Sequence, residues 1–306
     1  MGLYLRVKPW FLRLHRWVAL LFAIPLAIVF VTGLILSVEP VVSDQAVHGR
    51  SVSLQQIEQV LEKFDPQKKM TTLNVRAYDN QVILSEGRTG PSKRIHLGRT
   101  ELVTADDTSW SVVFTTARRM HENFLLDLGW LVTASTIATV LMIFLGLFMG
   151  WPFWRNSLGG WHRAGAWTML PLLVLSPLTG LALAWGITFN PPPKKIEGPI
   201  VPLRDAIKVI ATKHDLANVI WVRPQGGATR VRVYDKGEAK TIAVTSAGLV
   251  EGRTAWPRVL HEGVWAGRWS GLMNVLTALA FIGLMITGIT LWAQRTLMRR
   301  RLLRRR

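Results

Sequence analysis

The sequence contains no cysteine among its 306 residues. This absence excludes disulfide bonds, thiolate-held iron–sulfur clusters, cysteine nucleophiles and the covalent haem attachment that uses a C-x-x-C-H motif. The chain also lacks a Walker loop, a G-x-G-x-x-G fingerprint, an H-E-x-x-H motif and a G-x-S-x-G motif. Neither nucleotide binding nor hydrolysis therefore has a visible site.

Acidic residues are scarce as well, since 19 Asp and Glu stand against 37 Lys and Arg, which gives a net charge of +18. All of the acidic residues lie in two long loops, 39–127 and 190–268, where basic residues accompany them as on a soluble surface. The unopposed basic residues lie beside apolar blocks. We therefore interpret the excess charge as a signal of membrane topology and of anchoring to the lipid bilayer, and we predict no nucleic-acid partner.

Apolar residues, which make up 49% of the chain, concentrate in four blocks at 14–38, 128–151, 164–187 and 271–292. Each block is close to the roughly 20 residues that a helix needs to cross the hydrocarbon core. Basic residues precede the first block, as in a signal peptide, but the block runs past 20 residues and no small-x-small site follows Gly33. We predict that it is a retained helix.

The distribution of charge predicts the topology. The N-terminal segment, the short connection at 152–161 and the C-terminal tail carry Lys and Arg without Asp or Glu. Short segments of this kind stay in the cytoplasm, so both termini and the connection are expected inside and both long loops outside. This indicates a multi-pass membrane protein with both termini in the cytoplasm.

The two halves of the sequence resemble each other. His15-Arg16 recurs as His162-Arg163, and each histidine is followed seventeen residues later by a Thr-Gly-Leu triplet that begins at Thr32 or Thr179. His-Glu pairs at His121 and His261 precede the second and fourth apolar blocks. Each long loop contains one segment of helical spacing and segments that alternate like strands. The repeating unit is predicted to be helix, exported α+β module, helix.

This pattern divides the chain into eight segments. The predicted boundaries are 1–40 for the cytoplasmic N-terminus and first span, 41–120 for the first module, 121–151 for the second span, 152–161 for the connection, 162–189 for the third span, 190–260 for the second module, 261–293 for the fourth span and 294–306 for the basic tail.

Four histidines are the candidate ligands. His15 and His162 lie at the cytoplasmic ends of the odd spans, and His121 and His261 near the outer ends of the even spans, so each level has two imidazoles. Two imidazoles facing each other across a helical bundle suit a six-coordinate haem iron, and two levels predict two non-covalent b-type haems. Ligation of one haem by an adjacent odd and even helix is the alternative pairing.

Glycines and arginines accompany these histidines. Gly33 and Gly180 lie five helical turns from His15 and His162, on the same stripe, where they would admit a flat macrocycle or a closely packed helix. Other glycines near the histidine stripes are Gly146, Gly150 and Gly283. Arginines next to or near the histidines would bind haem propionates or simply mark the membrane edge. They are Arg16, Arg163, Arg119 and Arg258.

At these histidine and Thr-Gly-Leu motifs the chain resembles the PepSY-associated transmembrane family. The resemblance implies a protein of the bacterial inner membrane with periplasmic PepSY-like modules. Together with the residue patterns, it predicts an all-α four-helix transmembrane bundle, two periplasmic α+β PepSY-like modules and an internal duplication. Some similar members are di-haem reductases that pass electrons to ferric siderophores. For this chain the resemblance implies haem ligation by His15, His121, His162 and His261, a cytoplasmic electron donor and a periplasmic ferric complex as acceptor.

Two other functions remain open from the sequence. The exported modules would bind a peptidase or a peptide in a non-enzymatic regulator, in which the helices serve only as anchors. Alternatively, the chain would be the haem-bearing membrane subunit of a separate oxidoreductase.

Overall fold

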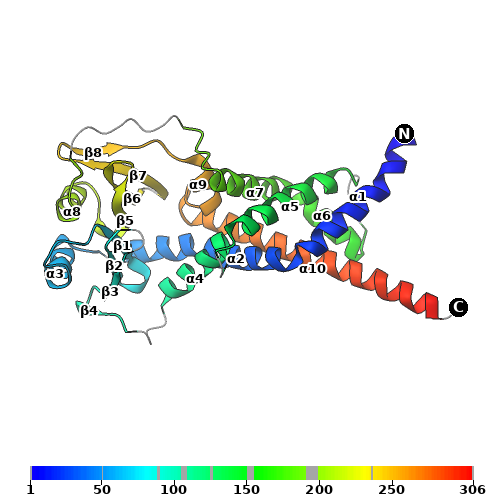
Figure 1. The fold of residues 1–306 in the computed structure, drawn as a ribbon, viewed down its shortest axis with the longest axis horizontal. Coiled ribbons are helices and arrows are strands. Elements are labelled where there is room, and N and C mark those ends of the chain that lie inside the picture. Colours follow the sequence, from blue (N-terminus) through cyan, green and yellow to red (C-terminus); the bar gives the residue numbers. More distant parts are fainter. Residues whose placement is uncertain are drawn as a thin grey trace.

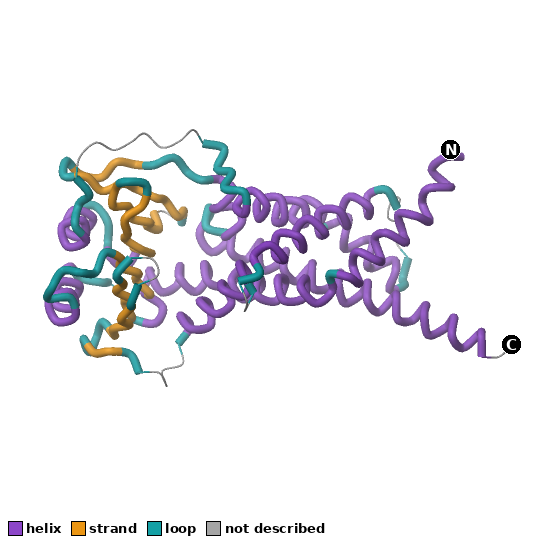
Figure 2. Tube along the Cα trace, viewed as in Figure 1, coloured by secondary structure: helices purple, strands orange, loops and turns teal. Residues whose placement is uncertain are grey.

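The computed structural model describes residues 2–49, 51–87, 90–104, 109–124, 127–149, 155–190, 199–235 and 237–304. The molecule is elongated, with a helical region at one end and a sheet region at the other (Figure 1). Both termini lie at the helical end, far from the strands (Figure 2). Gly150 and Trp151, together with the first part of the predicted connection at 152–161, fall outside the described residues.

Three described helices are long and apolar enough to cross a membrane: α2 (Ala23–Gly49), α5 (Gly129–Leu147) and α10 (Gly267–Arg304). A bent pair, α6 (Leu158–Thr168) and α7 (Leu170–Ala184), supplies a fourth crossing if both helices belong to one span. A further helix, α1 (Gly2–Leu21), leads directly into α2. Only 11% of the apolar window in α10 is buried, so its side chains require lipid around them.

Proline accounts for both interruptions of the odd spans. Pro25 has no N–H to donate to the carbonyl of Leu21, and the chain breaks between α1 and α2 at Phe22. Pro171 stands in the first turn of α7, next to the 64° bend that separates α7 from α6. Pro177 lies inside α7 and is buried without a break.

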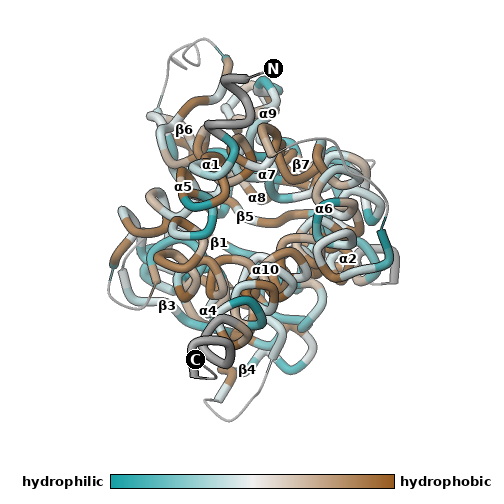
Figure 3. Tube along the Cα trace, turned by 90° about the vertical axis from the view of Figure 1, so that its right-hand side faces the viewer, coloured by the Kyte–Doolittle hydropathy of each residue, from teal (hydrophilic) through white to brown (hydrophobic). Residues whose placement is uncertain are grey.

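The spanning helices pack in pairs. Contacts join α2 to α10 and α5 to α7, while α1 lies against α5 and α6 lies against α10. The rings of Phe30 and Phe281 stack at 4.7 Å between α2 and α10. Viewed from the helical end, hydrophobic residues recur along the helices (Figure 3). These features make the chain a multi-pass membrane protein.

Two segments, one between α2 and α5 and one between α7 and α10, form one antiparallel sheet with eight strands among the described residues, in the order β4-β3-β2-β1-β5-β6-β7-β8. The first segment contributes β1 (Thr72–Arg76), β2 (Gln81–Ser85), β3 (Ser92–His96) and β4 (Glu101–Leu102). The second contributes β5 (Val219–Gln225), β6 (Ala228–Asp235), β7 (Glu238–Thr245) and β8 (Gly248–Glu251). The sequence suggests two separate small sheets, but β1 and β5 pair edge to edge, with Leu73 opposite Val222.

One face of this sheet is covered by two helices, α3 (Leu54–Phe64) and α8 (Leu203–Ala211). Their apolar sides pack on alternate strand residues such as Val82, Val222 and Val231, which are fully or almost fully buried. Ser53 caps α3 in a reciprocal capping box with Gln56. Short 3₁₀ turns, η1 (Ala77–Asp79) and η2 (Leu216–Asn218), complete the domain.

Two short helices connect the sheet with the spans: α4 (Trp110–Asn123) before α5, and α9 (Trp256–Glu262) before α10. His121 and His261 lie near the C-terminal ends of these connecting helices. The sequence places both histidines at the start of the spanning helices themselves, whereas the structure starts these helices at Gly129 and Gly267. Both histidines therefore lie on the short connecting helices and not on the spanning helices.

Candidate functional site

The structure brings His121 and His261 together. Their ring centroids are 6.2 Å apart, with the ring planes inclined at 43°. His121 comes from α4 and packs on α2, while His261 comes from α9 and packs on α7. We call these two residues the outer pair.

Hydrogen bonds fix the tautomer of His121. Its Nδ1 lies 3.1 Å from the carbonyl oxygen of Val29 and 3.1 Å from the hydroxyl of Thr32. The Thr32 hydroxyl already donates its proton to the carbonyl of Ile28 at 2.6 Å. Both neighbours therefore accept, so Nδ1 carries the proton and the lone pair is on Nε2.

The same arrangement holds His261. Its Nδ1 lies 3.1 Å from the carbonyl oxygen of Ser176 and 3.2 Å from the hydroxyl of Thr179, which donates to the carbonyl of Leu175. Again Nδ1–H is the donor and Nε2 has the lone pair. Thr32 and Thr179 stand out in the sequence only as parts of a repeated triplet, and the structure gives each of them a partner histidine.

His15 and His162 lie in α1 and α6, and we call them the inner pair. Nδ1 of His15 donates to the carbonyl of Met142 in α5 at 3.0 Å. Nδ1 of His162 donates at 2.8 Å to the hydroxyl of Thr287 in α10, which in turn donates to the carbonyl of Gly283. Each half of the chain thus holds its inner histidine from its own second span.

All four histidines form their hydrogen bonds through the same ring nitrogen, Nδ1. In each of them Nδ1–H is engaged, and no hydrogen bond within the described chain engages Nε2. A metal-ligating histidine commonly donates its other N–H to a carbonyl in this way, which orients the ring and makes the ligating nitrogen more basic. The donor set is therefore that of imidazole ligands.

The spacing of the outer pair fits a metal between two imidazoles. A bond of about 2.0–2.1 Å from a metal to each ring nitrogen places the two ring centroids about 6 Å apart when the ligands are opposed. The observed separation is 6.2 Å. Two protein ligands are fewer than a structural zinc requires, whereas haem brings four nitrogens of its own and needs two axial ligands. The residues present fit a bis-imidazole haem.

Three of the glycines in the helices lie directly against histidine rings. A Cβ at Gly33 would lie 3.2 Å from Cε1 of His121, and one at Gly180 would lie 3.1 Å from Cε1 of His261. A Cβ at Gly288 would lie 3.5 Å from Cε1 of His162. Gly33 and Gly180 therefore admit the outer rings beside the threonines. The space near Gly146 and Gly283 is open to 4 Å.

Arginines lie near both pairs, with different environments. Arg16 and Arg163 are exposed, and Nε of Arg163 donates to the carbonyl of Gly159. Arg258 bonds to Glu262 at 2.9 Å. Its counterpart three residues before His121 is the half-buried Arg118, whereas Arg119, the candidate from the sequence, is exposed.

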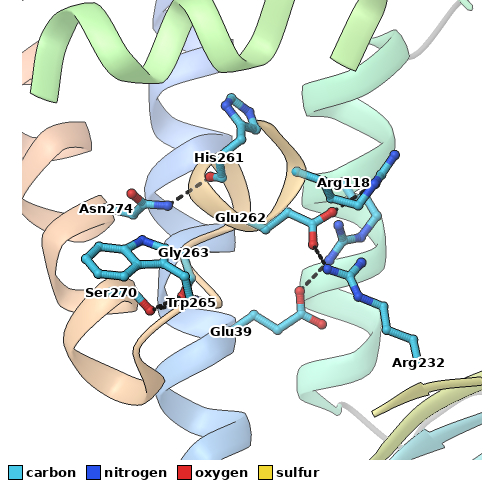
Figure 4. Close-up of polar contacts among 10 residues, drawn as sticks. Glu39, Arg118, Arg232, His261, Glu262, Gly263, Trp265, Ser270 and Asn274 are labelled. Atoms are coloured by element: carbon cyan, nitrogen blue, oxygen red, sulfur yellow. Dashed lines mark hydrogen bonds and ion pairs between the residues drawn. The ribbon is translucent and has the colours of Figure 1, made fainter. Parts of the chain in front are cut away.

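A charged cluster connects the outer pair with the sheet. Glu39 of α2 accepts from Arg118 and from the hydroxyl of Tyr78, and Glu262 of α9 accepts from Arg232 of β6 at 2.6 Å. Figure 4 shows the two carboxylates facing these guanidinium groups, with His261 directed away from them. Burial acts to raise the pKa of Glu262, but the positive charges of Arg232 and Arg258 outweigh burial and lower it to about 2.

The turn after His261 is fixed by polar contacts to α10. Nδ2 of Asn274 donates to the carbonyl of His261 at 2.8 Å, and the hydroxyl of Ser270 donates to the carbonyl of Gly263 at 2.8 Å (Figure 4). Gly263 has a φ of +68°, and a Cβ there would lie 2.7 Å from Nδ2 of Asn274. Only glycine satisfies both the backbone and the space.

The fold and site define a class of protein: a multi-pass membrane protein in which two segments between the spans share a sheet and two histidines, one from each half, are paired. Residues 12–295 match the family described as the PepSY-associated TM region. The match covers nearly the whole chain, and the chain belongs to this family. Comparison with curated proteins finds no match.

Proposed function

We propose that the chain is a transmembrane electron-transfer protein of the bacterial inner membrane that binds two b-type haems. His121 and His261 would ligate the outer haem, and His15 and His162 the inner one. Electrons would pass from a cytoplasmic one-electron donor to a ferric complex, such as a ferric siderophore, outside the membrane. Each ferric ion would take up one electron and leave as the ferrous ion.

One observation carries this proposal. Each of the four histidines donates Nδ1–H to a carbonyl or a threonine, which leaves the lone pair of Nε2 for a ligand. A histidine that merely bridges two helices would use either nitrogen. Four rings in one tautomer, with the outer two 6.2 Å apart, favour ligation.

A bis-imidazole haem iron carries one electron at a time and has no open coordination position, so it supplies outer-sphere electron transfer. Hydrogen bonds from the chain hold the rings that would ligate the haem in one orientation. Thr32 and Val29 hold one outer ring, and Thr179 and Ser176 hold the other. The two levels are separated by about 25 Å along the first span, from the helical rise between His15 and Thr32, so one haem at each level divides the crossing.

The first test is an absorption spectrum of the detergent-purified chain, oxidised and dithionite-reduced, with haem measured per chain. We expect low-spin b-type bands and close to two haems. Replacing His15 or His261 by Ala should lower the content to about one. His214→Ala, which changes a histidine in the sheet domain, is the control and should retain both haems. A purified chain without haem would contradict the proposal.

Reduction of a ferric chelate distinguishes an independent reductase from a subunit. After reduction, the isolated chain should be reoxidised by a ferric complex without another protein. Reoxidation that requires a separate protein would support a haem-bearing subunit of a larger oxidoreductase. Full activity in the His15→Ala and His261→Ala variants would instead favour a regulatory role for the sheet domain.

A further inference from the structure

Two neighbouring strands carry three arginines on the sheet face opposite α3 and α8. The register places Trp221 of β5 opposite Arg232 of β6, and Arg223 opposite Arg230. The alternate residues, Val222 and Val231, point to the buried core under the helices. We call the set Trp221, Arg223, Arg230 and Arg232 the arginine face.

This arrangement places like charges together. Arg223 and Arg230 are directly opposed on adjacent antiparallel strands, where like charges destabilise a sheet. The guanidinium of Arg223 lies 4.0 Å from the ring centroid of Trp221, which orients it along the sheet. Arg230 forms no ion pair in the described part of the chain, and its Nε donates to the carbonyl of Gln225. The charge of Arg230 is therefore available to an anion bound on this face.

Arg232 adds a buried donor to this surface. Its exposure is 9%, one guanidinium nitrogen bonds to Glu262, and its Nε is buried without a hydrogen-bond partner among the described residues. A buried donor from a charged group is destabilising while it has no acceptor. An anionic oxygen bound against the face would balance the charge of Arg230 and accept a hydrogen bond from Nε of Arg232.

The neighbouring strands add no negative charge on this face. The residues that flank the arginines in the same orientation are Asn74 on β1 and Thr241 and Ala243 on β7. The face meets the helical region at Glu262, which directly follows His261. A ligand bound to the face would therefore lie beside the helix that carries one half of the outer pair.

We propose that the arginine face binds an anionic metal chelate whose outer oxygens are carboxylates. This inference rests on the proposed function, because it names the class of ferric complex that the outer pair would reduce. Guanidinium groups in a planar array recognise carboxylates by paired, charge-assisted hydrogen bonds, while Trp221 keeps the Arg223 fork in place. Neutral or cationic chelates would lack this recognition.

The test measures binding without reduction. Gallium(III) citrate, a redox-inert substitute for ferric citrate, is titrated by calorimetry into the full chain in nanodiscs of zwitterionic lipid. Arg230→Gln and Arg223→Gln should each weaken binding by about tenfold or more, as expected for a charge-assisted hydrogen bond. Arg99→Gln, in the turn between β3 and β4, is the control and should bind like the wild type. A gallium trihydroxamate without negative charge should not bind.

Several outcomes would overturn the inference. Equal affinity in both arginine variants, or equal binding of citrate and trihydroxamate complexes, would contradict it. Loss of citrate binding in nanodiscs that contain anionic lipid would assign the face to lipid headgroups instead. Haem spectra of the same samples separate the two proposals: citrate binding by a chain without haem would remove the proposed function and keep the site, whereas two haems without citrate binding would do the reverse.

Discussion

The rings of His121 and His261 lie 6.2 Å apart although they come from opposite halves of the chain and from two different connecting helices. Each ring is seated in the same way, with Nδ1 against a threonine and Cε1 against the glycine that follows it. The Thr-Gly pair is therefore a socket for an imidazole. Two sockets on α2 and α7 set the separation of the rings, and the predictions below follow from that geometry.

Adding a methyl group to a socket should remove the outer haem. In Gly180→Ala the new Cβ would lie 3.1 Å from Cε1 of His261, so the ring must shift away from its acceptors. We expect the haem content to fall from about two to about one per chain, in pyridine haemochrome assays. Gly33→Ala should act in the same way on His121.

Two glycines provide matched controls for this effect. Gly146→Ala in α5 and Gly283→Ala in α10 meet no atom within 4 Å. They should retain both haems and gain up to about 1 kcal/mol of helix stability, because alanine is the better helix former. An unchanged haem content in Gly180→Ala would show that the socket has no part in ligand placement.

Removing the hydroxyl of a socket should weaken haem binding without abolishing it. In Thr179→Val the carbonyl of Ser176 still accepts from Nδ1 of His261, but the second acceptor is gone. Partners of this kind typically account for about 10–100-fold in metal affinity. Haem transfer to apomyoglobin would measure the loss. Thr290→Val, an exposed α10 threonine bonded only to its own helix, should transfer haem at the wild-type rate.

The sequence predicts the four histidines and the elements of the sheet domain, but not how the two halves meet. Helical spacing predicts a helix in each long loop, and in the first loop the structure has α3, which begins after its cap Ser53. The pairing of β1 with β5 joins segments far apart in the chain, and nothing local specifies it. Sequence alone thus gives two modules where the structure has one sheet.

The sockets show the same limit at single residues. Gly33 is predicted on the stripe of His15 in one continuous helix, but in the structure its contact is His121. The contact depends on α4 ending before α5, so that His121 can turn towards α2. The equal spacing from His15 to Thr32 and from His162 to Thr179 is the signal from which a shared role could have been drawn.

The turn that carries His261 should be sensitive to one methyl group. Gly263→Ala places a side chain at a φ of +68° and a Cβ 2.7 Å from Asn274. The backbone cost alone is about 1–2 kcal/mol, and the displaced amide leaves the carbonyl of His261 without its donor. We expect a lower midpoint in differential scanning fluorimetry and loss of the outer haem. Gly248→Ala, also at positive φ but open to 4 Å, should lower the midpoint while both haems remain.

The ion pair between Glu262 and Arg232 should stabilise the fold over a defined pH range. The pKa of Glu262 is lowered from 4.5 to about 2 in the folded chain. A lowered carboxylate pKa contributes stability above the unfolded value, and this contribution is lost as the pH falls towards the folded value. The wild type should therefore exceed Glu262→Gln in thermal midpoint by a constant margin above about pH 5.5, and the margin should shrink progressively towards pH 2. Measurements in a non-ionic detergent avoid titration of the detergent itself.

Glu122→Gln is the control for this prediction. It changes the matching but exposed glutamate of α4 and should show little difference in thermal midpoint from the wild type at any pH. A Glu262→Gln margin that grows on acidification would mean that the carboxylate is strained by burial rather than stabilised by its arginines.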